Sequence, residues 1–303
     1  MNNEILNILL KDRTTEKNIL WANGEHSNRE IQAEHVDLIR PRHEKLRAHQ
    51  KQRTRDRAEI FTPPDICRLQ NDVTDTAWLR NIVTPWLKDS YKLEDDSSTA
   101  KAIIDGDFEK IAAAWFGQSK IFPAMPDAPA DTVVANWLAE NETLWQTYVT
   151  SPRLEITCGE APYLVSRYNA VTGEAIPLAE RSGLLDRKLR LVNAETKTLN
   201  DWTEWALRAV ESVYGYDFQG DNLFLARRNV FDTVVEYFAA KFDCKPPQNF
   251  WRKVADVISW NLWQMDGLTG SPPFQENANL FGGANCKIID WRTREVVEFA
   301  SCR

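Results

Sequence analysis

Residues 153–167 read Arg-Leu-Glu-Ile-Thr-Cys-Gly-Glu-Ala-Pro-Tyr-Leu-Val-Ser-Arg, and this stretch decides the predicted fold. Leu154 and Ile156 indicate a short buried strand, and the small residues that follow it indicate a tight turn. Gly159 in that turn lets a ligand approach the backbone, because glycine has no Cβ atom. Open α/β sheets bind ligands at the carboxyl ends of their strands. The stretch therefore predicts a ligand site, with a plain connecting turn as the competing interpretation.

The composition is that of a soluble protein. Of the 303 residues, 43% are hydrophobic and 27% are charged, and the length allows one or two domains. The net charge of −7 argues against a protein that simply coats nucleic acid. No signal peptide opens the chain, and no apolar run approaches the ~18 residues of a membrane helix. We therefore expect a cytoplasmic protein without membrane contact.

The cysteines and histidines do not indicate a disulfide framework or a metal site. The five cysteines are widely spaced and include no Cys-x-x-Cys pair: Cys67, Cys158, Cys244, Cys286 and Cys302. The four histidines lie near the N-terminus without metal-ligand spacing: His26, His35, His43 and His49. We expect reduced thiols and no bound metal.

Positive charge is concentrated between Arg40 and Arg57. This segment holds eight lysines and arginines against two acids, namely Arg40, Arg42, Lys45, Arg47, Lys51, Arg53, Arg55 and Arg57 against Glu44 and Asp56. A solvated helix face and a contact with a phosphate backbone both explain such a segment. The sequence leaves these two interpretations open.

Two regions are expected from the order of apolar and polar segments. Residues 1–57 are polar, with sparse apolar positions, and predict a basic helical N-terminal arm. Residues 58–303 predict the main domain, with a helical insertion at about 75–150. The chain has twelve tryptophans, most of which we expect to anchor the core, while a few could stack on bases.

After the central turn, strands and helices alternate. Residues 171–177 predict a hairpin-like excursion, and residues 181–191 predict a basic loop that is either solvated or in contact with DNA. The remaining expected elements are a helix after Asn200 or Asp201, a strand over 213–218, a helix over 223–242, a helix or strand over 257–268, and short buried strands at 287–291 and 295–299. This alternation predicts a mostly parallel sheet with helices on both faces.

Four motifs occur in a fixed order along the chain. They are Phe61-Thr-Pro63, Glu155-Ile-Thr-Cys-Gly-Glu-Ala-Pro162, Tyr214-Gly-Tyr-Asp217 with Leu225-Ala-Arg-Arg-Asn229, and Gln264-Met-Asp-Gly-Leu268. In this order they resemble the S-adenosylmethionine-dependent N6-adenine DNA methyltransferases of restriction–modification systems, most closely the proteins called restriction endonuclease subunit M. The resemblance runs from about Arg53 to the C-terminus. It implies a Rossmann-like class I methyltransferase sheet, double-stranded DNA as substrate, and a restriction or specificity subunit as a possible partner.

The resemblance also implies roles for individual residues. The methionine end of S-adenosyl-L-methionine would be lined by Phe61, Thr62 and Pro63. Its amino-acid portion would be held by Glu155 and by the backbone of Thr157, Gly159 and Glu160. Asp217 would accept hydrogen bonds from both ribose hydroxyls, and Asp266, followed by Gly267 and Leu268, would accept one from the adenine amino group. Asp217 capping a turn and Asp266 capping a helix are the structural alternatives.

The catalytic motif departs from that family, which has Asn, Asp or Ser followed by Pro-Pro and an aromatic residue at the end of its fourth strand. There, oxygen atoms accept hydrogen bonds from the target amino group and the aromatic ring stacks on the flipped base. One candidate matches in residue types but follows Asp266 almost directly: Ser271, Pro272, Pro273 and Phe274. The other closes an apolar strand but lacks the prolines: Asp290 and Trp291. Either candidate, or neither, could serve.

The spacing departs as well. Glu155 and Asp217 are 62 positions apart, whereas dinucleotide-binding folds place the ribose acid ~20 residues after the glycine turn. No separate target-recognition domain is evident. We expect methyl transfer to adenine N6 in DNA. The alternatives are a catalytically inactive or partner-dependent protein that binds cofactor or DNA as a regulatory, specificity or phage-defence factor, and a methyltransferase with another substrate.

Overall fold

The computed structural model describes residues 2–22, 27–45, 50–51, 53–55, 62–93, 97–122, 131–274 and 285–302. Its α-helices are α1 (Asn3–Leu10), α3 (Pro64–Ser90), α4 (Ser98–Ser119), α5 (Thr132–Glu140), α6 (Leu144–Thr150), α7 (Leu184–Glu195), α8 (Leu199–Glu211), α9 (Gly220–Lys241) and α10 (Phe250–Asn261). Its strands are β1 (Arg153–Glu155), β2 (Val213–Asp217), β3 (Leu262–Gln264), β4 (Lys287–Asp290) and β5 (Glu295–Glu298). Short 3₁₀ helices occupy Ala33–Leu38, Arg42–Glu44, Leu178–Glu180 and Phe299–Cys302.

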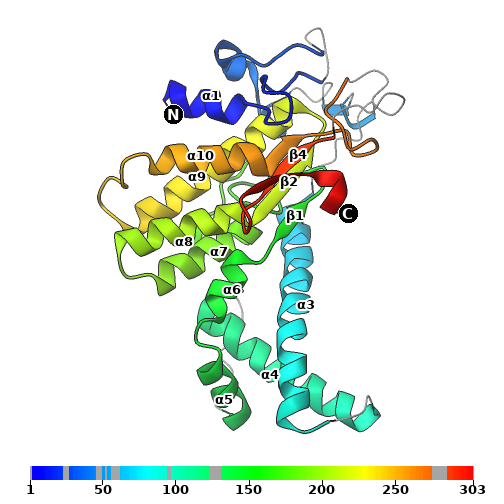
Figure 1. The fold of residues 1–303 in the computed structure, drawn as a ribbon, viewed down its shortest axis with the longest axis vertical. Helices are drawn as coiled ribbons and strands as arrows, with labels where there is room; N and C mark the ends of the chain where they lie inside the picture. Colours follow the sequence, from blue (N-terminus) through cyan, green and yellow to red (C-terminus); the bar gives the residue numbers. More distant parts are fainter. Residues whose placement is uncertain are drawn as a thin grey trace.

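A parallel sheet of three strands, in the order β1-β2-β3, forms the centre of the molecule (Figure 1). Arg153 pairs with Val213, and Gly215 pairs with Leu262. Helices α7 and α8 connect β1 to β2, and helices α9 and α10 connect β2 to β3. The expected mixed α/β architecture with a parallel sheet is therefore confirmed.

Strand β1 is the edge of this sheet, and its apolar side chains are not buried. Leu154 and Ile156 are 46% and 62% exposed, whereas Arg153 and Glu155 are buried. The prediction of a buried Leu154–Ile156 strand is therefore wrong. The reason is the position of the strand: Leu154 shares a face with Tyr214, and the elements that cover this face stop at β2.

The last two strands form a hairpin and do not extend the parallel sheet. Strands β4 and β5 pair with each other in antiparallel fashion, from Lys287 with Glu298 to Asp290 with Glu295. The hairpin and Phe299 pack on Tyr216 and Trp263, so this face of β2 and β3 is covered by strands where we expected helices. Most of β5 is exposed, so the expectation of two buried strands is wrong.

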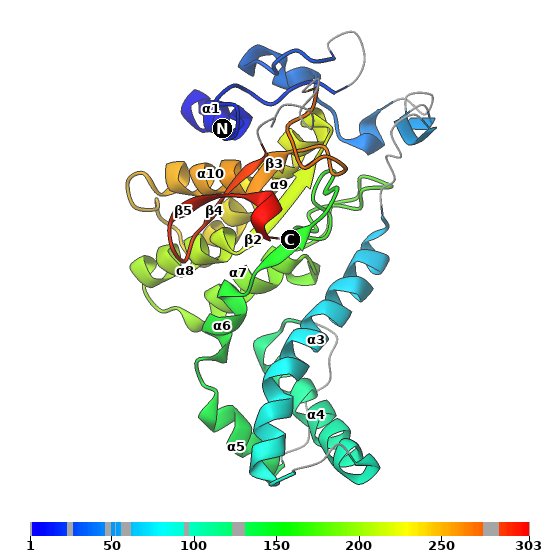
Figure 2. The ribbon, with the colours of Figure 1, turned by 45° about the vertical axis from the view of Figure 1, so that its right-hand side comes forward.

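Helices α3, α4 and α5 project away from the sheet and form an extension (Figures 1 and 2). Its core is aromatic. The ring centroid of Trp78 lies 5.5 Å from that of Trp115 and 5.1 Å from that of Tyr148 in α6. The buried Asp75 joins the extension to the sheet, because its carboxylate accepts hydrogen bonds from Tyr148, Arg153 and Arg187 at 2.6 to 3.1 Å. These three hydrogen bonds to one buried carboxylate fix how the two parts meet.

The segment expected as a basic loop at 181–191 is largely the buried helix α7. Arg187 is 1% exposed and pairs with Asp72 and Asp75, while Lys188 is fully buried and donates to the Ser151 carbonyl and the Ser212 hydroxyl. Both earlier interpretations, a solvated loop and a DNA contact, are therefore wrong for these residues. Arg187 can be buried in this helix because Asp72 and Asp75 on α3 neutralise its charge.

Part of the basic segment that begins at Arg40 is also held internally, although Arg40, Lys51 and Arg55 are exposed. The Arg42 N–H donates to Glu160 at 2.8 Å. Lys45 and Arg53 pair with the buried Asp221 at 3.4 and 2.9 Å, and both side chains are mostly buried. Neither a solvated face nor a phosphate contact describes Lys45 and Arg53, although their sequence neighbours 46–49 and 56–60 lie outside the described residues.

The N-terminal residues join the same core. Helix α1 packs on α10. Arg227 is completely buried and donates to the carbonyls of Leu9, Lys11, Ser259 and Leu262. Burial lowers its pKa to about 10. One arginine therefore connects the beginning of the chain to the start of β3.

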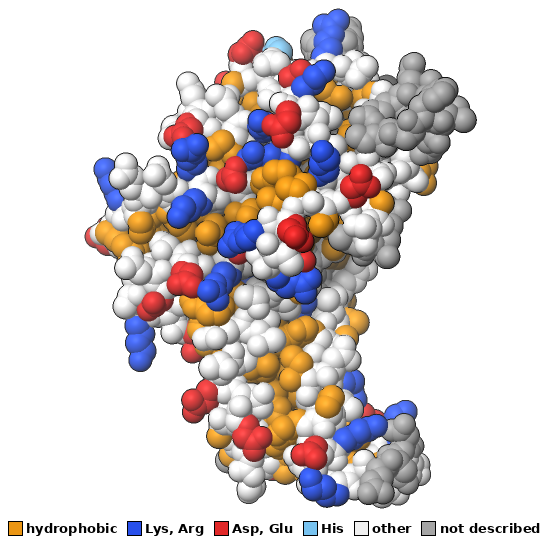
Figure 3. Space-filling model, viewed as in Figure 1, with side chains coloured by type: hydrophobic (Ala, Val, Ile, Leu, Met, Phe, Trp, Pro, Cys, Tyr) orange, Lys and Arg blue, Asp and Glu red, His pale blue; other side chains and the backbone are white. Residues whose placement is uncertain are grey.

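Among the residues that the structure describes, no helix combines the length and apolarity needed to span a bilayer. The same residues contain no cluster of three or more His, Cys, Asp and Glu side chains arranged to hold a metal ion. On the face drawn in Figure 3, basic and acidic side chains are interspersed among the coloured residues.

Candidate ligand site at the carboxyl edge of the sheet

Three acids lie at the carboxyl ends of the three parallel strands. Glu155 ends β1, Asp217 ends β2, and Asp266 follows β3 by two residues. Because Glu155 pairs with Gly215 and Asp217 with Gln264, the three acids follow one another along a single edge of the sheet. This is the edge at which the sequence predicts a ligand site.

The turn after β1 has an unusual backbone. Thr157, Gly159 and Ala161 all have positive φ angles, of 48°, 55° and 64°. A left-handed conformation is strained for a β-branched residue such as Thr157, and such strain is concentrated at functional sites. Asp217 holds the turn in place, since its carboxylate accepts hydrogen bonds from the Gly159 N–H at 2.8 Å and the Gln219 N–H at 2.7 Å.

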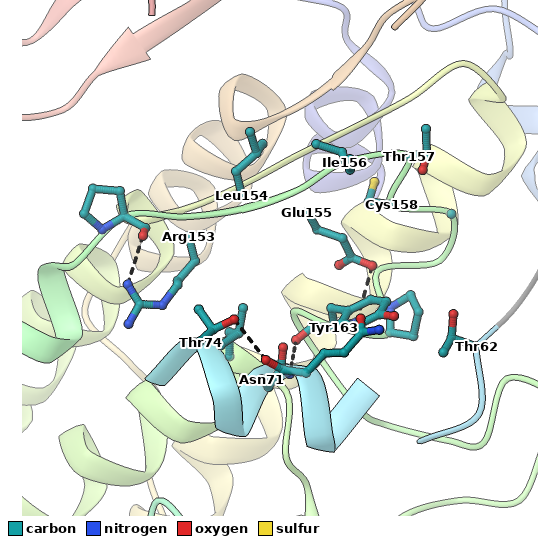
Figure 4. Close-up of a pocket in the computed structure, with 15 residues that line it drawn as sticks. Thr62, Asn71, Thr74, Arg153, Leu154, Glu155, Ile156, Thr157, Cys158 and Tyr163 are labelled. Carbon is teal, nitrogen blue, oxygen red and sulfur yellow. Dashed lines mark hydrogen bonds between the residues drawn. The ribbon is translucent and has the colours of Figure 1, made fainter. Parts of the chain in front are cut away.

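A cavity of ≈ 570 Å³ lies between β1 and the first turns of α3 (Figure 4). Four residues expected to bind the cofactor line it: Thr62, Glu155, Thr157 and Gly159. Figure 4 shows Glu155 pointing from β1 toward Tyr163, while Leu154 and Ile156 point to the other side of the strand. The volume is in the range of small-molecule sites.

Glu155 is the acid that gives this cavity its electrostatic character. Its carboxyl group accepts hydrogen bonds from the backbone N–H groups of Tyr163 at 3.3 Å and Leu164 at 3.1 Å. Burial raises the pKa of Glu155 to about 8, and the nearby Asp217 charge adds to this, although the two N–H groups oppose it. Glu155 is therefore mostly protonated at neutral pH, and a cation in the cavity would favour its ionised form.

Sequence reasoning missed the contribution of α3 to the cavity. The Asn71 side chain donates to the carbonyls of Tyr163 at 2.9 Å and Ser182 at 3.1 Å, which fixes the helix against the turn. A signal was present, because Asn71 and Asp75 continue the buried helical stripe that begins at Cys67. Polar residues at core positions of a helix require partners, and here one partner of each, Tyr163 for Asn71 and Arg153 for Asp75, lines the cavity.

The other described residues of the expected cofactor set do not line this cavity. Glu160 is buried, and its carboxylate accepts hydrogen bonds from the Arg42 N–H and the Tyr168 hydroxyl. Asp217 does not line the cavity, and both of its oxygens accept hydrogen bonds from backbone N–H groups. Pro63 is the residue before α3, and Phe61 lies outside the described residues.

Asp266, Gly267 and Leu268 form an exposed turn. One Asp266 oxygen accepts a hydrogen bond from the Leu268 N–H at 2.8 Å, and Leu268 is 96% exposed. A Cβ atom on Gly267 would lie 3.4 Å from the Tyr216 ring. The carboxylate of Asp266 therefore caps its own turn, close to the structural alternative considered for it, and remains partly accessible.

The two catalytic candidates lie at opposite ends of the sheet. Ser271, Pro272, Pro273 and Phe274 follow β3 at the carboxyl edge, where the Ser271 carbonyl accepts from the Asp266 N–H at 2.9 Å and the Phe274 ring lies 5.6 Å from Phe218. Asp290 ends β4 and Trp291 follows it. Both lie near the amino ends of the parallel strands, where the Trp291 N–H donates to Asn261 at 2.6 Å. Neither candidate lines the Glu155 cavity.

Comparison with protein-family models, with curated proteins and with solved structures finds no match for this chain. Its function is therefore argued from its own residues and geometry.

Proposed function

We propose that this chain binds S-adenosyl-L-methionine at the carboxyl edge of the sheet and transfers its methyl group to N6 of adenine in DNA. The observation that carries the proposal is the row formed by Glu155, Asp217 and Asp266 at the ends of three adjacent parallel strands, beside a strained glycine turn. In open α/β sheets this edge is where ligands bind.

The residues fit the amino-acid half of the cofactor. The cavity beside β1 presents Thr62, Thr157, Gly159 and the carboxyl group of Glu155. The bound cofactor would supply an electrophilic methyl group on a sulfonium, together with an ammonium group. Glu155 would hold that ammonium group as a carboxylate, because a nearby positive charge favours the ionised form of a buried acid.

The described residues fit the ribose of S-adenosylmethionine less well than its amino-acid half. Both Asp217 oxygens are already bonded to backbone N–H groups, and the residue is only 6% exposed. Each carboxylate oxygen has two lone pairs, so a ribose hydroxyl would share Asp217 with Gly159 or Gln219. Binding of the nucleoside half therefore requires an opening movement of the segments around Asp217.

For the methyl-accepting step we assign Ser271 to Phe274, because they lie on the same edge as the three acids. The Pro272 carbonyl and the Ser271 side chain would accept hydrogen bonds from the adenine amino group, and Phe274, at 37% exposed, would stack on the base. In the transfer, the nitrogen–carbon bond would form as the carbon–sulfur bond breaks, S-adenosylhomocysteine would leave as a neutral thioether, and the proton lost from N6 would pass to water.

A second candidate function is cofactor binding without methyl transfer by the chain alone. Two observations favour it: Asp217 is occupied by backbone donors, and neither catalytic candidate lines the cavity. In this case a partner, such as a restriction or specificity subunit, would complete the site.

Two measurements test these functions. Isothermal titration calorimetry of the full chain with S-adenosylmethionine tests binding, and Glu155→Gln is expected to weaken it about tenfold, since one charge-assisted hydrogen bond is lost. Mass spectrometry of varied duplex DNA after incubation tests for N6-methyladenine. Binding without methylation leaves the second function, whereas no binding rejects both.

A further inference from the structure

A second cavity, of ≈ 600 Å³, lies at the amino edge of the parallel sheet, on the side away from the three acids. Its walls come from the β4–β5 hairpin, the end of α8 and the start of β2, and we call it the hairpin groove. Only Pro152 lines both this groove and the Glu155 cavity. The two cavities are therefore separate sites on the same sheet.

The interior of the hairpin groove is apolar and aromatic. Tyr214, Ile288, Trp291 and Val297 line it. Both aromatic side chains are held in place, because the Trp291 N–H donates to Asn261 at 2.6 Å and the Tyr214 hydroxyl donates to the Ile289 carbonyl at 3.3 Å. Fixed aromatic walls with aliphatic neighbours suit a flat ring system.

The rim of the groove is cationic. Arg208, Arg292 and Arg294 line it together with two acids, Glu211 and Asp290, so the lining residues carry one surplus positive charge, although Arg208 also pairs with Glu204 outside the lining at 2.6 Å. Arg292 is paired with Asp290 at 3.0 Å, but its side chain is 86% exposed. An exposed pair of this kind contributes little energy, so the guanidinium is available to an incoming anion.

Arg294 connects the rim to the aromatic wall. It pairs with Glu211 at 2.9 Å, and its guanidinium carbon lies 5.2 Å from the centroid of the Trp291 ring. The guanidinium lies over the Trp291 ring, so a ligand that contacts Trp291 in the groove would have a positive charge close to it. This arrangement favours a ring that carries a negative charge over a neutral one.

We infer that the hairpin groove binds a small aromatic anion, with the ring against Tyr214 and Trp291 and the anionic group toward Arg292 and Arg294. Both an aromatic carboxylate and a nucleotide have this chemistry. The inference does not depend on the proposed methyl transfer, because the groove shares no residue with the three acids or with Ser271–Phe274. It gives Asp290 and Trp291 a role outside catalysis.

The test is calorimetric titration of the full chain with 2-naphthoate and with AMP, each compared with its neutral analogue, 2-naphthamide or adenosine. At least one anion is expected to bind at a single site, about tenfold more tightly than its neutral analogue. Naphthoate binding alone identifies an aromatic carboxylate as the natural class, and AMP binding alone identifies a nucleotide. Binding of both supports the shared chemistry.

Three variants locate the site. Arg292→Ala is expected to weaken binding about tenfold, and Val297→Trp is expected to abolish it by filling the groove. Arg252→Ala removes an exposed arginine from a different cavity and is expected to have no effect.

The inference is overturned if neither anion binds up to about 10 mM, if the neutral analogues bind equally well, or if Arg292→Ala binds like the wild type. Should Val297→Trp fail to fold by circular dichroism, the Arg292→Ala result decides.

Discussion

The carboxylate of Asp217 accepts a hydrogen bond from the N–H of Gly159 at 2.8 Å, across two adjacent strand ends and 58 positions of sequence. Its other oxygen accepts from Gln219 at 2.7 Å. Asp217 therefore stabilises the turn that shapes the candidate site, whether or not it also contacts a ligand.

Asp217→Asn is expected to destabilise the protein by about 1–3 kcal/mol, because the amide group cannot accept both hydrogen bonds and leaves a buried N–H without a partner. Urea unfolding followed by circular dichroism measures this change. Asp266→Asn is the matched control, since its carboxylate also accepts from a backbone N–H but in an exposed turn. Equal losses in the two variants would contradict the role given to Asp217.

Glu155 makes stability depend on pH. Burial raises its pKa from 4.5 to about 8, so the folded state binds this proton more tightly than the unfolded state does. The resulting stabilisation is complete below pH 4.5 and is lost as the pH rises toward 8. Unfolding free energies of the wild type are expected to fall across this window by on the order of 3 kcal/mol more than those of Glu155→Gln.

Asp186 is also buried, and burial raises its pKa to about 6. Its protonation therefore also stabilises the folded state at low pH, but this stabilisation is lost at a lower pH than that of Glu155. Most of the Asp186 contribution is lost below the interval from pH 6 to 8, and the comparison with Glu155→Gln within that interval isolates Glu155 from the other buried groups. Parallel stability curves for the wild type and Glu155→Gln in that interval would show that Glu155 is solvated in the folded protein.

Features that depend on residues close together in the sequence could be predicted, whereas features that depend on contacts between distant residues could not. Glu155 and Asp217 could be located from sequence because Glu155 opens the glycine turn and Asp217 closes the second strand, and such strand ends meet at one edge of a parallel sheet. Burial of Arg187 could not be predicted, because it depends on Asp72 and Asp75 of a helix more than 100 positions away. The hairpin was missed for a similar reason: β4 pairs with β5, and short apolar runs do not specify their partner strand.

Lys188 offers a test of the buried helix α7. It is fully buried, its hydrogen bonds in the described structure go to Ser151 and Ser212, and burial lowers its pKa well below the usual range. Lys188→Met keeps the volume and removes the charge, so unfolding free energy is expected to stay constant or rise by about 1–2 kcal/mol. Lys188→Ala opens a cavity and is expected to lose about 2–4 kcal/mol.

The pH response of these variants has a definite sign. Because the pKa of Lys188 is lower in the folded than in the unfolded state, its folded-state penalty grows as the pH falls below 10.5. The advantage of Lys188→Met over the wild type is therefore expected to be larger at pH 7 than at pH 10. A Met variant that loses more than about 2 kcal/mol at pH 7 would show that the two hydrogen bonds outweigh the charge.

The two catalytic candidates can be separated by substitution, since they lie at opposite edges of the sheet. If methyl transfer uses the Ser271–Phe274 segment, Phe274→Ala removes the stacking surface for the base and is expected to lower the rate about tenfold to a hundredfold. Asp290→Ala, at the far edge, is expected to leave the rate within about twofold.

Loss of activity in Asp290→Ala with full activity in Phe274→Ala would assign the chemistry to the hairpin, and would require the hairpin to reach the carboxyl edge in the active protein. Calorimetry with S-adenosylmethionine on both variants shows whether a slower rate reflects lost chemistry or lost cofactor binding, because neither side chain lines the Glu155 cavity.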